Sequence, residues 1–425
     1  MAVERTIQES ISTSGIRVSI GLLLSRRFGT FWFASLLSNI GTWAQQVAQP
    51  WLLLSLGASS FVIGLDAFAL NAPVLLLTLV GGVLADHADR RKIIARFQSA
   101  QMLCPIILVA LLLAGSTRPW MVVSLSVVVG VTDALSMPSF QSIVPSIVRH
   151  DQIASGLALN STQFNLSRIL GPALAGVMLA GAGAMACFAV SAISYVPFIL
   201  VAVWILPGRV GPPSVLGAGG YRQIYAGVFK IARIPYFSGA LLTVFLSSLL
   251  CAQIVTFCPV LIKDVFHGSA GDFSLAISAF GAGGLLGAFG LLFVSASTDR
   301  RMLTSCFAGV YGLILVLVGL NPWLRILPLL LGLCGAAMSV SSIASNTLIQ
   351  ANAPVALRGE SVSLYMLAMR GGLAIGSLLT GASVNFFGVA HALLINGAVA
   401  VVAQILVGRY WQRAKLPIAA AGDAS

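Results

Sequence analysis

Four ionisable side chains lie inside long apolar stretches of the sequence, and they are the residues best placed to do chemistry: Asp66, Asp133, Arg168 and Arg370. A charged residue at the centre of a membrane-spanning helix costs about 2.5–3.5 kcal/mol on insertion scales, so such residues face protein or water and are functional candidates. Asp66 and Asp133 could exchange protons, because apolar surroundings favour the neutral form of a carboxyl group. Arg370 could attract an anionic group of a solute, or bind backbone carbonyls only.

Asp133 and Arg168 are expected to lie within side-chain reach of each other in depth, given a rise of about 1.5 Å per helical residue. They could form a static buried ion pair. Alternatively, a proton on Asp133 releases Arg168 and couples protonation to a substrate or a gate. Asp66, in the outer third of its stretch, is our preferred proton site, although a hydrated group near an outer opening would fit the same position.

A polar stripe follows the first apolar stretch, where six side chains fall within an arc of about 120° at helical spacing. They are Ser38, Asn39, Thr42, Gln45, Gln46 and Gln49. Amides in hydrocarbon need partners, so the stripe is expected either to line a central cavity, with Asn165 and Asn71, or to bond neighbouring helices. A mostly apolar pocket with scattered polar groups favours an amphiphilic organic solute over a sugar or an inorganic ion.

The elements that must position these residues are membrane-spanning helices, so the predicted fold class is all-α. Of the 425 residues 58% are hydrophobic and only 8% charged, which leaves too little polar surface for a soluble globule. Apolar runs of about 20 residues cross a bilayer, and continuous runs exclude a β-barrel, whose strands alternate. Twelve spans are predicted, at 28–56, 61–84, 93–115, 120–138, 156–182, 184–206, 237–262, 272–295, 302–320, 325–345, 361–384 and 390–411.

The net charge of +12 reflects topology rather than nucleic-acid binding. Nineteen of the 24 Lys and Arg residues lie on the side of the predicted spans that holds the N-terminus, and only Arg118, Lys263 and Arg325 lie on the other. The positive-inside rule therefore predicts a multi-pass protein of the cell inner membrane with both termini cytoplasmic.

The sequence divides near its middle, at its longest polar interruption. We predict a cytoplasmic tail 1–27, a six-helix bundle 28–206, a cytoplasmic linker 207–236, a second six-helix bundle 237–411 and a cytoplasmic tail 412–425. Asp89-Arg90-Arg91 recurs as Asp299-Arg300-Arg301, 210 residues later, and Gly171-Pro172 through Gly176 is echoed 205 residues later from Gly376 to Gly381. Such repeats suit two pseudo-symmetric bundles that rock about a midplane site.

The run Gly82-Val83-Leu84-Ala85-Asp86-His87-Ala88-Asp89-Arg90-Arg91-Lys92 resembles the loop-2/3 motif of the major facilitator superfamily. Three further stretches resemble its drug:proton antiporter branch, which includes macrolide-efflux and enterobactin-export proteins. They are Asn39 to Thr42 with Trp43 and Gln45, Leu159 to Arg168 and on to Gly176, and Leu357 to Tyr365 before Gly376. The chain departs from the superfamily pattern at His87 and Asp89, where a basic residue and a glycine are usual.

The resemblance implies gating roles for these motifs. Asp86 near a helix end can face the positive N-terminus of a neighbouring helix, while Arg90 and Arg91 anchor the cytoplasmic face, which together would make a breakable latch. The alternative is that the arginines only set topology, and the same two options apply to the shorter copy at Asp299, Arg300 and Arg301. Gly171, Pro172 and Gly176 resemble a span-five antiporter motif, with Ser167 in place of an upstream glycine.

The leading hypothesis is a secondary active transporter that exports an amphiphilic drug, siderophore or secondary metabolite by proton-coupled antiport and alternating access. There is no Walker A pattern and no HExxH, so an ion gradient must supply the energy and no enzyme is expected. Proton-coupled uptake, and a non-transporting membrane sensor or assembly factor, remain alternatives. We expect no metal, no cofactor beyond the proton gradient and no nucleic acid; the partners are a small-molecule substrate and the lipid bilayer, and the chain is expected to be a monomer.

Overall fold

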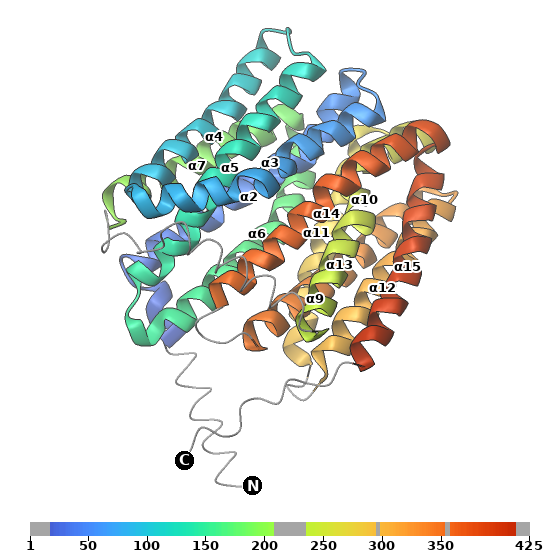
Figure 1. Ribbon diagram of the computed structural model, residues 1–425. Coiled ribbons are helices and arrows are strands. Elements are labelled where there is room, and N and C mark those ends of the chain that lie inside the picture. The colour runs from blue at the N-terminus through green and yellow to red at the C-terminus, as the bar shows by residue number, and fades with distance from the viewer. Residues whose placement is uncertain (1–17, 208–234, 295–297, 353–357, 414–425) are drawn as a thin grey trace. The chain divides into compact units, whose positions relative to one another are not determined.

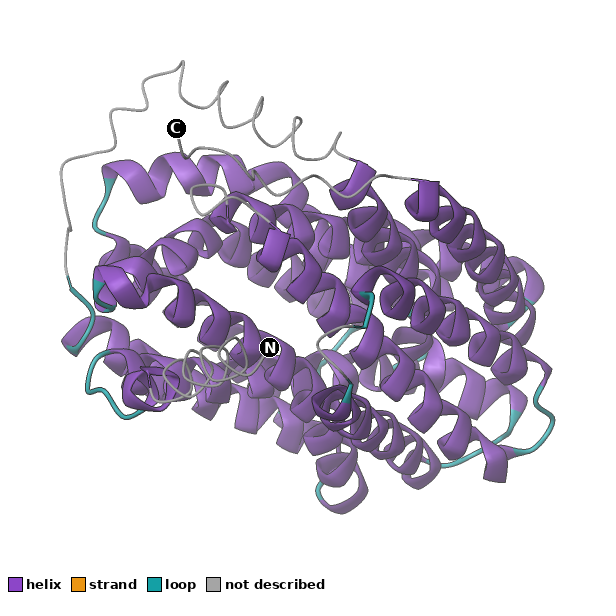
Figure 2. Cartoon of the chain, turned by 90° about the horizontal axis from the view of Figure 1, so that it is seen from below, coloured by secondary structure: helices purple, strands orange, loops and turns teal. Residues whose placement is uncertain are grey.

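The computed structural model describes residues 18–207, 235–294, 298–352 and 358–413. Residues 1–17 of the first predicted tail, most of the predicted linker 207–236 and residues 414–425 of the second tail therefore lie outside the described residues, while residues 18–23 of the first tail are helical. Within the described ranges every regular element is a helix (Figure 2). The all-α prediction is confirmed.

The helices follow the predicted spans closely (Figure 1). Those of the first half are α2 (Phe28–Ser55), α3 (Ser60–His87), α4 (Arg90–Leu113), α5 (Pro119–Ile147), α6 (Ile153–Gly181) and α7 (Gly183–Trp204). Those of the second half are α9 (Pro235–Leu246), α10 (Gln253–Val260), α11 (Ala270–Gly290), α12 (Arg300–Leu320), α13 (Leu327–Asn352), α14 (Arg358–Phe387) and α15 (Val389–Arg413). The seventh span joins α9 to α10 through a π-helical turn, Ser247–Cys251, and ends in another, Leu261–Val265.

Eleven helical segments in the described part of the chain are long and apolar enough to cross a membrane. The helix outside that set is α2, which carries the polar stripe and has 28 residues. At a rise of about 1.5 Å per residue it is still longer than the roughly 30 Å hydrocarbon core, so it completes the predicted twelve.

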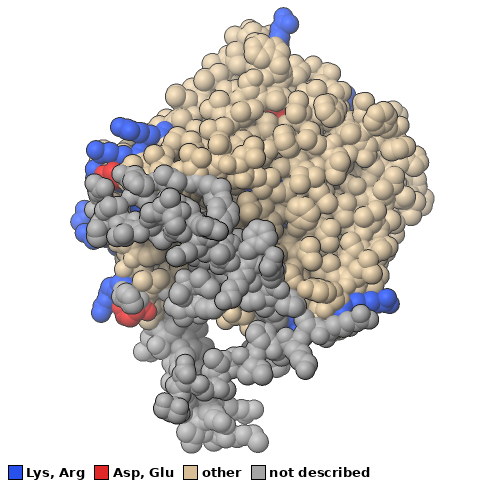
Figure 3. Space-filling model, viewed as in Figure 1, with Lys and Arg blue, Asp and Glu red and all other residues tan. Residues whose placement is uncertain are grey.

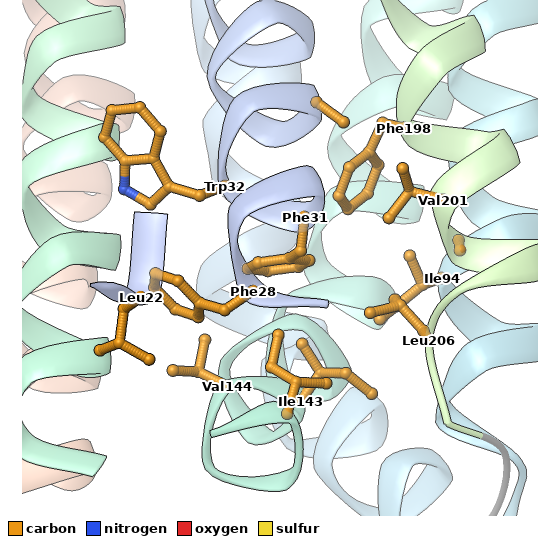
Figure 4. Close-up of a cluster of buried hydrophobic side chains, with 13 residues drawn as sticks. Leu22, Phe28, Phe31, Trp32, Ile94, Ile143, Val144, Phe198, Val201 and Leu206 are labelled. Carbon is orange, nitrogen blue, oxygen red and sulfur yellow. The ribbon is translucent and has the colours of Figure 1, made fainter. Parts of the chain in front are cut away.

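The fourth span was predicted to end at 138, but α5 continues to Ile147. Its last turns are buried because Ile143, Val144 and Ile147 pack in an aromatic-rich cluster with Phe28 and Phe31 (Figure 4). Burial against other helices extends α5 beyond its interior Pro138, which a local pattern does not reveal.

The described residues group into two compact units by their contacts, and each is considered by itself. One holds the chain to Leu52 and from Pro73 to 207; the other holds Leu53–Ala72 and the chain from 235 onward. The helix α3 is thus divided at Pro73, which lies inside it. The predicted bundle boundaries stay a prediction.

Small residues let helices pack backbone to backbone in the second unit. A methyl group on Gly283 of α11 would meet the Gly332 carbonyl of α13, and one on Gly335 of α13 would meet the Phe280 carbonyl of α11. This is the close packing that small residues provide in membranes, where apolar side chains gain nothing by leaving lipid.

Large hydrophobic side chains are exposed along the helices, among them Leu76, Trp204, Leu286 and Phe386. The face drawn in Figure 3 is mostly uncharged, with Lys and Arg gathered at its margins. An apolar surface of this extent requires lipid as the solvent.

Candidate functional site

The polar stripe of α2 bonds α7 at two positions in the first unit. The Thr42 hydroxyl lies 2.9 Å from the hydroxyl of Tyr195, and Ser191 donates to the Gln45 amide oxygen at 2.7 Å. The backbones approach closely there, because a methyl group on Gly41 would meet the side chain of Ser194. Thr42 and Gln45 therefore join two helices, one of the two roles that the sequence left open.

A third stripe residue bonds a different helix. Gln49 is buried and donates from Nε2 to the Ser126 hydroxyl of α5 at 2.6 Å. Asn39 and Gln46 are half-buried, and Asn165 of α6 donates to the Ser161 carbonyl one turn earlier. Contact of these residues with a substrate stays a prediction.

Asp133 of α5 and Arg168 of α6 are both half-buried in the first unit. The predicted pairing of Asp133 with Arg168 stays a prediction.

The membrane charges of the second unit are buried. Asp66 is 5% exposed and Arg370 is 8% exposed, and a guanidinium nitrogen of Arg370 donates to the Asn71 amide oxygen at 2.9 Å. Asn71 donates in turn to the Ala67 carbonyl of its own helix, which fixes its amide so that the oxygen faces Arg370. The contact orients one planar cation inside the second unit.

The two Asp-Arg-Arg runs have the same local structure. Asp89 is the N-cap of α4, and its carboxylate accepts from the Arg91 backbone N–H at 3.0 Å. Asp299 is the N-cap of α12, and its carboxylate accepts from the Arg301 backbone N–H at 2.9 Å and from the Arg301 guanidinium at 3.1 Å. The repeat found in the sequence is therefore also a repeat of structure.

The other gating candidates are only partly described. The side chains of Asp86 and His87 lie outside the described residues, so the latch stays a prediction. Arg91 donates to the Val203 carbonyl at 3.4 Å. Arg90 and Arg300 are half-buried. Gly82 is not required for close packing, because a methyl group there would meet nothing within 4 Å.

The span-five motif lies in α6. A methyl group on Gly171 would meet the Trp43 side chain of α2, so Gly171 permits close packing of these two helices. Pro172 lies inside α6 and is buried, as is Gly176. Close packing of α6 against α2 is therefore sufficient to explain why residue 171 is a glycine.

Sequence reasoning missed Tyr195, Ser191 and Ser126, the partners of the stripe. A signal was present in the sixth span, because Ser191, Ser194 and Tyr195 recur at three- and four-residue spacing and share one helical face. Within the described ranges, no group of three His, Cys, Asp or Glu residues is arranged to hold a metal ion.

Comparison with solved structures supports this fold. The crystal structure of a D-xylose-proton symporter matches 92% of this chain and 100% of its own with a TM-score of 0.70, at 13% sequence identity. At that identity the match concerns the fold alone, which is the major facilitator fold.

Curated relatives align with most of the chain. The staphyloferrin A transporter of Staphylococcus aureus is 24% identical over 86% of this chain and 92% of its own. The multidrug efflux pump Tap of Mycolicibacterium fortuitum is 26% identical over 87% and 93%, and the enterobactin exporter EntS of Shigella boydii is 25% identical over 83% and 84%.

The family model described as "transmembrane secretion effector" matches residues 20–424, which is nearly the entire chain. The family and the relatives are transporters and not enzymes. The chain is therefore a multi-pass membrane transporter of the major facilitator superfamily and belongs to its transmembrane secretion effector family.

Proposed function

We propose that the chain exports an amphiphilic small organic molecule by proton-coupled antiport and alternating access. The observation that carries the proposal is the pair of carboxyl groups inside membrane-spanning helices, Asp66 at 5% exposure and the half-buried Asp133. The surroundings of such a group decide how tightly it holds a proton, so a conformational change can load and release it.

The named relatives support the direction of transport. Two of them are described as an efflux pump and an exporter, and the third as a transporter of staphyloferrin A. Drug or siderophore export is therefore favoured over uptake for this chain.

The oriented Arg370 supports a narrower substrate class. A guanidinium group presents several N–H donors in one plane and suits carboxylates and similar anions. We propose that the exported molecule carries an anionic group together with a larger apolar part.

The distribution of basic residues supports the orientation. With nineteen Lys and Arg residues on one side of the spans and three on the other, both termini lie in the cytoplasm of a cell whose inner membrane holds the protein. The proton gradient supplies the energy, and the chain acts as a monomer.

Inside-out membrane vesicles test the proposal, with staphyloferrin A, enterobactin and ethidium as probes. An acidified lumen should drive accumulation of at least one probe, and a protonophore should abolish it. Membranes without the protein are the control. The matched variants Asp66→Asn and Asp133→Asn should lose proton-driven accumulation and keep probe binding.

An importer that couples uptake to protons would instead empty preloaded vesicles under the same gradient. Cells with and without the gene should also differ in an extracellular metabolite. Unchanged extracellular metabolites, together with no gradient-driven movement of the three probes, would contradict export.

A further inference from the structure

The helices α4 and α7 of the first unit pack against each other with opposite directions. Arg91, near the start of α4, donates to the Val203 carbonyl, near the end of α7, at 3.4 Å. Ile94 of α4 belongs to the same buried cluster as Val201 and Leu206 (Figure 4). The start of α4 and the end of α7 therefore lie at the same membrane surface.

Together the two helices present an apolar surface, which we call the α4–α7 face. At about 100° per residue, the exposed apolar side chains of each helix fall on one side of it, away from its buried residues. They are Leu103, Ile106 and Ile107 of α4 and Ile193, Val196, Leu200 and Val203 of α7, each at least 40% exposed. In a membrane-spanning chain a surface of this kind is covered by acyl chains.

Two cations lie on this face at the end where α4 begins. Lys92 and Arg96 are both exposed, and at helical spacing they share an arc of about 100° with the exposed apolar side chains of α4. Arg96 follows Arg90 by six residues, which places it about 9 Å along the helix axis from the first residue of α4. An arginine thus projects from the lipid side of a membrane-spanning helix.

Within the described residues the protein supplies no counter-charge for these two cations. Neither the Lys92 nor the Arg96 side chain forms a hydrogen bond or an ion pair there. The Asp89 carboxylate caps α4 and accepts a backbone N–H of that helix at 3.0 Å, and Asp151 is paired with Arg149 at 3.5 Å. Cations on a lipid-facing surface extend their long side chains to the polar headgroups, where a counter-charge is found.

An exposed indole marks the headgroup level at the same end of the face. Trp204 is the last residue of α7 and is 76% exposed. Tryptophan is enriched where the hydrocarbon core meets the headgroups, because its ring is apolar and its N–H is polar. The α4–α7 face therefore has an apolar part, two cations and an interfacial aromatic residue, in the order in which a phospholipid presents its chains and its headgroup.

We propose that the α4–α7 face binds an anionic phospholipid, with the phosphate group between Lys92 and Arg96 and the acyl chains along the exposed apolar side chains. The two cations are four residues apart on one helix, so their side chains are neighbours and can share one phosphate. Near an anionic membrane surface each cation contributes about fivefold in affinity, which favours an anionic headgroup over a zwitterionic one. The site requires neither a transported substrate nor a proton gradient.

Quenching of Trp204 fluorescence by brominated lipids tests the site in nanodiscs. The contribution of Trp204 is the difference between the wild type and Trp204→Phe. Phosphatidylglycerol and phosphatidylcholine with the same brominated acyl chains are each diluted into unbrominated phosphatidylcholine. Half-maximal quenching by phosphatidylglycerol should occur at a mole fraction about fivefold or more below that of phosphatidylcholine.

Charge variants locate the preference. The double variant Lys92→Gln, Arg96→Gln should quench equally with both lipids, whereas Lys92→Arg, Arg96→Lys, which keeps both charges, should retain the preference. The matched control is Arg118→Gln, Arg325→Gln, which removes two exposed cations from the opposite ends of the spans and should also retain it.

Four results would overturn the inference. They are equal quenching by the two lipids in the wild type, a preference that survives neutralisation of Lys92 and Arg96, a preference abolished by excess inorganic phosphate, and no quenching by either lipid. The third would indicate a site for soluble anions, and the fourth a face covered by another protein surface.

This inference and the proposed function can fail separately, because the quenching experiment uses no transported probe. A wild type with a phosphatidylglycerol preference and no proton-driven accumulation in vesicles would contradict only the proposed transport. Proton-driven accumulation together with equal quenching by the two lipids would contradict only the lipid site.

Discussion

At the scale of single residues, Asp89 and Asp299 show one side chain setting the same local structure twice. Each caps a helix by accepting from the backbone N–H two residues later. Asp299→Ala should lower stability by about 0.5–2 kcal/mol, while Asp299→Asn, which keeps a capping oxygen, should cost only a few tenths. Thermal unfolding of the purified protein measures both, and equal losses in the two variants would contradict a capping role.

The charge of Asp299 predicts a pH dependence. Partial burial favours its neutral form, but hydrogen bonds from the Arg301 side chain and backbone outweigh this, so the pKa of Asp299 lies below its ordinary value. A lowered pKa gives stability that is fully present above the unfolded-state value, about 3.9, and is lost as pH falls through the folded-state value.

The stability difference between wild type and Asp299→Asn should therefore be constant from pH 8 to about pH 5 and shrink only near pH 4 and below. Unfolding midpoints across this range test it. A difference that disappears between pH 7 and pH 6 would show that another group is responsible.

Arg370 yields a prediction about specificity. The Asn71 contact orients its guanidinium, so Arg370→Gln should raise the KM for a transported anionic probe at least tenfold, which corresponds to about 1.4 kcal/mol. Transport of ethidium, a cation, should be unchanged or improved. Asn71→Leu should reproduce part of the loss, because the cation remains but is no longer held in place.

Arg325→Gln is the control for this experiment, since it removes the same charge from an exposed position. Staphyloferrin A serves as the anionic probe in the vesicle assay. Equal losses for the anionic probe and for ethidium would assign Arg370 to folding or gating instead of recognition.

At the scale of elements, the length of the hydrophobic runs predicted the described helices well. Helical spacing identified their polar side chains but not the residues to which these side chains bond. The polar face of α2 was identified, yet the bonds from Gln45 to Ser191 and from Gln49 to Ser126 join residues far apart in sequence. A local pattern shows that an amide needs a partner, and only the packed helices show which one it has.

The seam between α11 and α13 should not accept a larger side chain. Gly283→Leu would place its side chain against the Gly332 backbone, so we expect a loss of about 1–3 kcal/mol or more, or failure to accumulate in the membrane. Gly309→Leu in α12 is the matched control, because a methyl group there meets nothing within 4 Å. Membrane abundance and thermal unfolding of the two variants should differ clearly.

The π-helical turn Ser247–Cys251 depends on a side chain for its hydrogen bonding. Gln253, 1% exposed, donates to the Ser248 carbonyl at 2.9 Å and also reaches the Leu373 carbonyl of α14 at 3.5 Å. Gln253→Met keeps the volume and removes the donor, so unfolding should become easier by about 1–3 kcal/mol. Gln350→Met, in a half-buried position, should cost less; equal losses would contradict the role of Gln253.

At the scale of the whole molecule, the number of spans could be predicted from the sequence. The thickness of the bilayer requires apolar runs of about 20 residues, and such runs can be recognised in the sequence. The candidate site was harder to predict. Asp66, Asp133 and Arg370 were found because membrane charges are rare, whereas Tyr195 is an ordinary residue type for a span and was found only through its hydrogen bond with Thr42.

The orientation of the chain in the membrane follows from the positive-inside rule and can be tested by labelling. Ser116 between α4 and α5 and Thr298 before α12 are both exposed, and they should lie on opposite sides. In a Cys306→Ser background, which removes the exposed cysteine and leaves five buried ones, an impermeant maleimide on spheroplasts should label Ser116→Cys and spare Thr298→Cys. Inside-out vesicles should show the reverse. The opposite result would contradict the predicted cytoplasmic location of both termini.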